Sequence, residues 1–313
     1  MTFTAAIPTA SSNKDFLLDA WNAQLGSVCG AFRTVASTEQ ITGSISTRSF
    51  MGMEIVNVNV SPSHIIRSQK DVRSDGAEYY FLIGQIAGKA HIQHSGRSVL
   101  LAAGDMVLVD SSQESKFIYA GSESKSISNQ LSVHVPRTFL EGKLSPHQFG
   151  ERIEANSDLA HCVWVQLTAI EEVISLFNDS RIYPDAFREL FLKAFTYMFY
   201  TDRHQDRFVK IMSNLLKEAG AQVSGVDFLA DMSASSRRTI FRIFEKRDTS
   251  LGEMLKYIRL LRFLKLCKSH AHSSVHPTVS SLIYQAGFSD ISNFNHLFKA
   301  NFGITPRELM TKH

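Results

Sequence analysis

Residues 279–309 read VSSLIYQAGFSDISNFNHLFKANFGITPREL, and this stretch decides the fold of the C-terminal part of the chain. Its first apolar residues recur at helical spacing, and Gly287 can adopt the positive φ that ends a helix. Ser289 or Asp290 can cap the next helix, which stops at Gly303. A short helix, a glycine turn and a capped second helix form the layout of a helix-turn-helix unit.

The second helix of this unit separates an apolar face from a polar one. Phe294, Leu297 and Phe298 recur at three- and four-residue spacing, so they bury one face. Asn293 and His296 on the other face are candidates for base contacts, because an asparagine amide pairs well with adenine. The alternative is a helix that contacts only the DNA backbone. The residues expected to meet DNA are Ser289, Asp290, Ser292, Asn293, Asn295, His296 and Lys299.

An earlier segment repeats this layout. Residues 228–232 form the first helix, Ala234 lies in the turn, and Ser236 is the expected cap. Arg238 and Arg242 are the first candidates for base contacts, since an arginine can bond guanine through two hydrogen bonds. The alternative is that the arginines of this helix bind only phosphates. The residues expected to meet DNA are Ser236, Arg237, Arg238, Thr239, Phe241 and Arg242.

One long helix is expected between the two units. Ser236 and Ser289 are 53 positions apart, and Leu251–Leu266 between them has helical periodicity. A rigid helix can place both units on one face of a duplex, where successive major-groove sites lie about 34 Å apart.

The region from Val226 to Leu309 resembles the AraC/XylS family of transcription regulators. GFSDISNFNHLFKANFGITP matches the signature of that family, and RLLR at residues 259–262 matches its linker helix. The sequence departs from the family pattern at Ala234, where the first turn usually has glycine, and at Leu261 and His296. The resemblance implies a regulator that activates transcription on double-stranded promoter DNA, contacts RNA polymerase and forms a homodimer.

The first half of the chain has the periodicity of strands. From about Ile41 to Val135, polar and apolar residues alternate in short segments such as Met53–Val60, separated by turn signals such as Ser95-Gly96. Many short strands indicate a barrel or a sandwich. Residues 15–32 indicate a short amphipathic helix before them.

The stretch GQIAGKAHIQHSGRSVLLAAGDMVLVDSSQESKFIY, with VPRTFLE at 135–141, resembles the ligand-sensing barrel of AraC/XylS members that regulate aromatic catabolism, the FeaR-like regulators. This resemblance implies a small aromatic effector (an amine, aldehyde or acid) and control of a catabolic operon. The predicted fold class is α+β. An N-terminal cupin-like β-barrel with flanking helices precedes a C-terminal all-α domain with two helix-turn-helix units.

Two apolar helical stripes follow the strands, at about 158–177 and 187–198, and the polar segment 200–207 follows them. We therefore expect an effector-sensing and dimerisation domain over residues 1–200, with its barrel at about 41–135 and its helices at about 158–199. Residues 201–313 are expected to form the DNA-binding domain.

An effector pocket in the barrel needs an apolar lining and a few polar groups. If the effector is a carboxylate, an arginine is its natural partner. Each candidate has an alternative role in the core or on the surface. The candidates are Arg48, His64, Arg67, Tyr79, Tyr80, His91 and Trp164.

Two alternatives compete with effector control. The first is a constitutive DNA-binding regulator whose N-terminal domain only dimerises. The second, weaker one is a metal-dependent cupin enzyme. His91 and His94 are three positions apart on a strand and point to opposite faces, and the loop histidines His270, His272 and His276 are typical of a solvated segment. No catalytic constellation is apparent, so we expect no enzyme, no metal and no cofactor.

Charge and composition fit this division. Residues 203–313 carry 17 basic and 9 acidic side chains, whereas residues 1–202 carry 16 and 21. A basic C-terminal part suits contact with phosphate. Cys29, Cys162 and Cys267 form no CxxC pair, so no zinc site is indicated. No uncharged apolar run reaches the ~18–20 residues that span a bilayer, and the first residues lack the pattern of a signal peptide, so the expected location is the cytoplasm.

Overall fold

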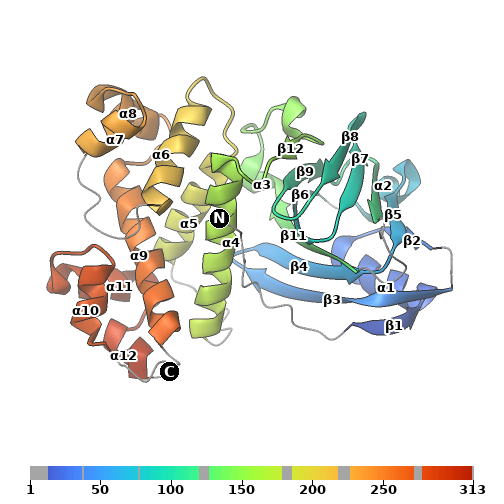
Figure 1. Ribbon diagram of the computed structural model, residues 1–313, viewed down its shortest axis with the longest axis horizontal. Coiled ribbons are helices and arrows are strands. Elements are labelled where there is room, and N and C mark those ends of the chain that lie inside the picture. The colour runs from blue at the N-terminus through green and yellow to red at the C-terminus, as the bar shows by residue number, and fades with distance from the viewer. Residues whose placement is uncertain are drawn as a thin grey trace. The chain divides into compact units, whose positions relative to one another are not determined.

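The computed structural model describes residues 13–36, 39–76, 78–119, 127–177, 185–217, 226–270 and 277–311. The chain divides into two compact units, Met1–Ala160 and His161–His313 (Figure 1). The first is rich in strands and the second is helical, as the α+β prediction requires.

Unit 1 is built from two antiparallel sheets. The larger sheet has the order β1 (Lys14–Leu17), β3 (Gln40–Phe50), β4 (Met53–Val60), β11 (Ser128–Pro136), β6 (Tyr79–Ala87), β9 (Met106–Asp110) and β12 (Arg152–Ile153). The smaller sheet has the order β2 (Arg33–Val35), β5 (Ser63–Arg67), β10 (Ser115–Tyr119), β7 (Ala90–His94) and β8 (Arg97–Leu101).

Both sheets contribute to one hydrophobic core. Val58 of β4 and Ile83 of β6 lie in the same buried cluster as Ile65, Ile92 and Phe117 of the smaller sheet. Alternation along each strand sends every second side chain into this shared interior. The predicted cupin-like barrel is therefore confirmed.

Short helices flank the sheets of unit 1. The helix expected over residues 15–32 is shorter, because Lys14–Leu17 pair with β3 as strand β1, and α1 spans Leu18–Cys29. Trp21 of α1 is fully buried and donates a 2.8 Å hydrogen bond from Nε1 to Thr34 Oγ1 on β2. The other helical segments of this unit are α2 (Gln69–Asp75), α3 (Arg137–Leu140) and the 3₁₀ turn Pro146–Gln148.

Unit 2 is all-helical. Its elements are α4 (Asp158–Leu176, which begins just before the division), α5 (Asp185–Tyr197), α6 (Gln205–Lys217), α7 (Val226–Met232), α8 (Arg237–Glu245), α9 (Leu251–His270), α10 (Val279–Gln285), α11 (Ile291–Phe302) and α12 (Pro306–Thr311). The long helix α9 lies between the α7–α8 pair and the α10–α11 pair (Figure 1).

Helices α4 and α5 pack on the helices that follow them. Phe187 of α5 lies 6.3 Å from the ring of Tyr257 on α9 and 4.7 Å from that of Phe302 on α11. Tyr257 also donates a 3.3 Å hydrogen bond to Gln166 of α4. The compact units therefore divide at residue 160, whereas the sequence placed a boundary near residue 200. The assignment of sensing and dimerisation to residues 1–200 stays a prediction.

Helix α4 has the length and apolar composition of a membrane span, and it is the one such helix found in the described part of the chain. Within the protein, 67% of that apolar window is buried. Cys162, Val163 and Ile170 of α4 are at most 1% exposed. This is the pattern of a core helix.

Candidate nucleic-acid interface

The turn between α7 and α8 comprises residues 233–236. Ala234 has a φ of 47°, and its amide donates to the Asp231 carbonyl at 3.2 Å. The next amide, that of Ser235, donates to the Ala230 carbonyl at 2.9 Å. Ser236 then caps α8, because its Oγ accepts a 3.1 Å hydrogen bond from the Thr239 amide. The turn therefore ends one helix and starts the next, as expected.

The turn between α10 and α11 has the same opening but is longer, comprising residues 286–290. Gly287 has a φ of 95°, and the Phe288 amide donates to the Ile283 carbonyl at 3.2 Å. Asp290 caps α11 by accepting a 3.0 Å hydrogen bond from the Asn293 amide. Of the two predicted caps the structure uses Asp290, so the two helix starts are not in strict register.

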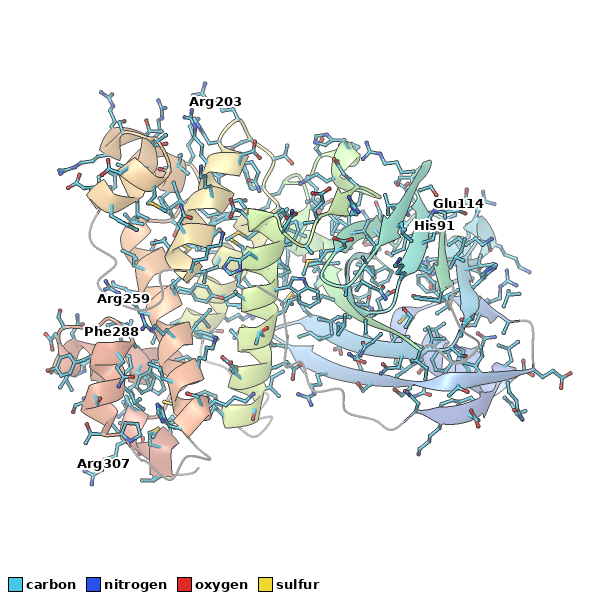
Figure 2. All side chains as sticks on the ribbon, in the orientation of Figure 1. His91, Glu114, Arg203, Arg259, Phe288 and Arg307 are labelled. Atoms are coloured by element: carbon cyan, nitrogen blue, oxygen red, sulfur yellow. The ribbon has the colours of Figure 1, made fainter. Side chains whose placement is uncertain are left out.

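Position 287 favours glycine because of its neighbours as well as because of its positive φ. A Cβ at this position would lie 3.3 Å from Nε of Arg259 on α9. The Arg259 guanidinium also lies 5.9 Å from the ring centroid of Phe288, and the two side chains are labelled near each other in Figure 2. The linker helix α9 therefore supports the second turn directly.

The outer face of α8 is basic. Arg237, Arg238 and Arg242 are exposed, and the exposed fraction of Phe241 is 54%. Arg237 forms an ion pair with Asp227 on α7. Arg238 and Arg242 form no ion pair with any residue that the structure describes. Two arginines one helical turn apart are therefore available to an anion or a base edge.

The outer face of α11 is polar and nearly neutral. Phe294 and Phe298 are fully buried, whereas the predicted contact residues point outward. Lys299 is the cation of this face. The exposed residues at the start of the helix and along it are Ser289, Asp290, Ser292, Asn293, Asn295, His296 and Lys299. The outer faces of α8 and α11, the second helices of the two units, therefore differ in chemistry. Their individual DNA contacts stay predictions.

The histidines that suggested a metal site have other roles. His91 is hydrogen bonded to Ser98 Oγ at 2.6 Å, whereas His94 is buried. The His94 ring contacts the Glu114 carbonyl at 3.1 Å and accepts from the Asp110 amide at 3.0 Å. Burial lowers the pKa of His94 and favours its neutral form.

No group of three or more metal-ligating side chains lies within the described residues. His272 and His276 lie outside them.

The interior of unit 1 contains a small cavity of about 30 Å³, which is room for about one water molecule. Its lining is mostly apolar and aromatic. It comprises Leu25, Cys29, Phe32, Val58, Ile65, Phe81, Ile83, Phe117, Tyr119, Gln130, Ser132 and His134.

None of the seven predicted effector-binding residues lines this cavity. Arg67 is buried in an ion pair with Asp75, at 2.7 and 2.8 Å, and its Nε donates to the Ser111 carbonyl. Trp164 is a core residue of α4 in unit 2. The other five occupy surface, partly buried or buried positions elsewhere in unit 1: Arg48, His64, Tyr79, Tyr80 and His91.

The polar groups of the cavity are uncharged. Tyr119 donates a 2.6 Å hydrogen bond to Gln130 Oε1. Burial lowers the pKa of His134 to about 4, and its Nε2 is buried without a partner among the described atoms. Burial raises the pKa of the Cys29 thiol to about 12. The cavity therefore offers hydrogen bonds and no net charge at neutral pH. The sequence analysis did not single out these lining residues, because which strand side chains face the interior depends on strand register. The effector-binding residues stay a prediction.

Comparison with known proteins agrees with this architecture. Residues 21–180 match the AraC-binding-like domain, and residues 229–312 match a helix-turn-helix domain family. The transcriptional activator NphR of Rhodococcus sp. is 22% identical over 280 residues, which cover 85% of this chain and 80% of NphR.

Two further similarities cover different extents. The transcriptional activator RhaS of Escherichia fergusonii is 30% identical over 108 residues, which are 34% of this chain and 37% of RhaS. The crystal structure of the AraC-like transcriptional activator CuxR is similar with a TM-score of 0.46 and 13% identity, over 87% of this chain and 99% of CuxR.

Proposed function

The chain belongs to the AraC-type family of DNA-binding transcription regulators, and from this premise we propose that it activates a promoter in response to a small uncharged aromatic effector. The effector binds at the cavity of unit 1, and the lining side chains move apart to admit it, because the space of about 30 Å³ holds only about one water molecule. The promoter controls genes for catabolism of a small aromatic compound, and the regulator acts as a homodimer in the cytoplasm together with RNA polymerase.

The lining of the cavity carries this proposal. Its aromatic and aliphatic walls suit a ring, and Ser132, Gln130 and His134 supply hydrogen bonds. An ionised ligand entering this interior would lose its hydration without gaining a counter-ion, which is costly. The previously expected range of amine, aldehyde or acid therefore narrows to uncharged molecules such as an aldehyde or a phenol.

Promoter recognition is divided between α8 and α11. Arg238 is well placed to bond a guanine in the major groove, and Asn293 an adenine. The names of NphR and RhaS, both transcriptional activators, support activation over repression.

Benzaldehyde, benzylamine and benzoate have similar rings and differ in charge, so they test the proposal on the full chain. Benzaldehyde should raise Tm with increasing concentration, because a ligand that binds only the folded state stabilises it. Ser132→Leu, which narrows the cavity, should abolish the shift. Ser98→Leu, the same change on the exposed strand β8, should retain it.

A larger shift with benzoate or benzylamine would contradict the uncharged class of effector. If no compound of a broad aromatic panel shifts Tm or changes promoter binding, the chain is a constitutive regulator. Turnover of any of these compounds would instead favour a cupin enzyme.

A further inference from the structure

Three exposed cations gather at the end of the first helix-turn-helix unit. Arg203 lies two residues before the start of α6. Arg242 lies on α8, and Lys246 lies one turn later, just after that helix. Figure 2 shows Arg203 projecting at the outer edge of unit 2. We call these three residues the flanking cluster. Arg203 is outside the part of the chain that matches the helix-turn-helix family, residues 229–312.

The buried imidazole of His204 contacts Arg203, and the charges of Lys246 and Arg242 also act on it. Arg203 Nε is 3.1 Å from His204 Nε2. The pKa of His204 is lowered by burial and then by the charges of Arg203, Lys246 and Arg242, while Asp202 opposes this effect. Arg203 and Lys246 are the chain neighbours of Asp202 and Arg247, whose 2.9 Å ion pair brings the two segments together.

A buried ion pair fixes this region. Arg247 is 1% exposed and donates to Asp202 at 2.9 Å and to Gln205 Oε1 at 3.2 Å. Its guanidinium lies 4.4 Å from the ring centroid of Phe208 on α6. Asp202 also accepts a 2.9 Å hydrogen bond from the His204 amide. The segment that carries Arg203 is thereby held against the end of α8.

The flanking cluster has no acidic partner of its own. None of its three cations forms an ion pair with a residue in the described ranges, and Asp202 is already engaged by Arg247. Like charges repel one another, so a group of three cations without an acidic partner is stabilised by an external anion. Because Arg238 and Arg242 lie one turn apart on α8, the cluster continues the basic face of that helix toward α6.

We propose that Arg203, Arg242 and Lys246 bind phosphates of the DNA backbone beside the major groove that α8 enters. This proposal rests on the DNA-binding function and divides the work of α8. Arg238 contacts bases, whereas Arg242 acts with the flanking cluster on the backbone. The cluster contributes affinity and salt dependence, and it adds no sequence preference.

Fluorescence anisotropy of the full chain tests the proposal at several salt concentrations. The probes are a duplex selected in vitro by the wild-type protein and a random-sequence duplex of equal length. Each lost phosphate contact should make the slope of log K against log salt less negative by about 0.9. Near 0.15 M salt, this change corresponds to roughly a five-fold loss of affinity. Arg203→Ala and Lys246→Ala should each lose this amount on both duplexes.

Three further variants serve as controls. Lys89→Ala removes an exposed positive charge from unit 1 and should leave the slope unchanged. Arg203→Lys should restore most of the affinity lost in Arg203→Ala, because a phosphate accepts either cation. Arg238→Ala should weaken binding to the selected duplex much more than to the random one.

An unchanged slope in both Arg203→Ala and Lys246→Ala would overturn the proposal. So would a loss confined to the selected duplex, which would make the cluster a reader of bases. Failure of the wild-type protein to select or bind any duplex would instead refute the DNA-binding function itself, so the two failures are distinguishable.

Discussion

The two helix-turn-helix units have the same turn geometry after their first helix, but their second helices differ in charge and in capping residue. In both, the first helix ends with the same pair of backbone hydrogen bonds and a residue of positive φ, Ala234 in one and Gly287 in the other. The first unit then presents arginines from a serine-capped helix, and the second presents amides from an aspartate-capped one. Backbone hydrogen bonding therefore defines the motif, while side-chain chemistry sets what each copy does.

The difference also concerns what holds each unit in place. The first is anchored through the buried pair Arg247–Asp202, and the second through Arg259 packed beneath Gly287. The recognisable signature lies in the second unit, yet most of the positive charge lies in the first. The unit with the closer match to the family signature is therefore the one with fewer basic side chains.

The largest effect is expected where one anchor is removed. Asp202→Ala leaves the buried Arg247 without its partner, which should cost about 3 kcal/mol of unfolding free energy. Denaturant unfolding measures the loss. Hydrogen exchange should show α8 amides losing protection while α11 amides keep theirs. Asp206→Ala, an exposed acid one turn later, is the control. Equal loss of protection in both helices would show that the anchors are not separate.

We expect Arg238 of the first unit to contribute at least as much to base recognition as Asn293 of the second. Arg238→Ala should cost about 1–3 kcal/mol on a selected duplex, and Asn293→Ala no more than that. Competition against single-base variants of the duplex assigns each residue to a position in the site. If both variants retain full affinity and selectivity, these two residues are not the readers.

Exchanging the turn residues should have opposite effects in the two units. Gly287→Ala adds a Cβ at positive φ beside Arg259, so we expect a loss of about 1–2 kcal/mol. Ala234→Gly relieves the same backbone conformation and should be neutral or stabilising by less than about 1 kcal/mol. Thermal unfolding of both variants and of the double exchange checks this sign reversal. A loss of stability in Ala234→Gly would mean that the Ala234 methyl makes a compensating contact.

The caps should show the smallest contrast. Ser236→Ala and Asp290→Ala each remove one side-chain acceptor, at a cost of about 0.5–2 kcal/mol. The aspartate also interacts favourably with the helix dipole, so Asp290→Ala should be the more costly and the more sensitive to salt. Unfolding at low and high ionic strength separates the two contributions. Ser289→Ala, next to the true cap, should have little effect.

Sequence reasoning predicted what depends on local spacing. The turn glycine, the caps and the buried faces of α8 and α11 follow from residues a few positions apart, and the structure confirms them. The division at residue 160 could not be predicted this way, because it depends on the contact of Phe187 with Tyr257 and Phe302, far along the chain.

The lining of the cavity in unit 1 could not be predicted for a related reason. Whether Ser132 or Arg67 faces the barrel interior depends on strand register and on a long-range partner such as Asp75. Neither is visible in composition. Charged side chains are prominent in a sequence, whereas their surroundings are not: Arg67 is buried and paired with Asp75.

The protonation state of the Cys29 thiol affects how the cavity wall would react with a bound molecule. With its pKa raised to about 12, it stays protonated and is a poor nucleophile. An aldehyde of the kind proposed as effector would therefore meet a thiol and no thiolate in the cavity wall. Its binding would then rest on non-covalent contacts, and its occupancy would rise and fall with its concentration.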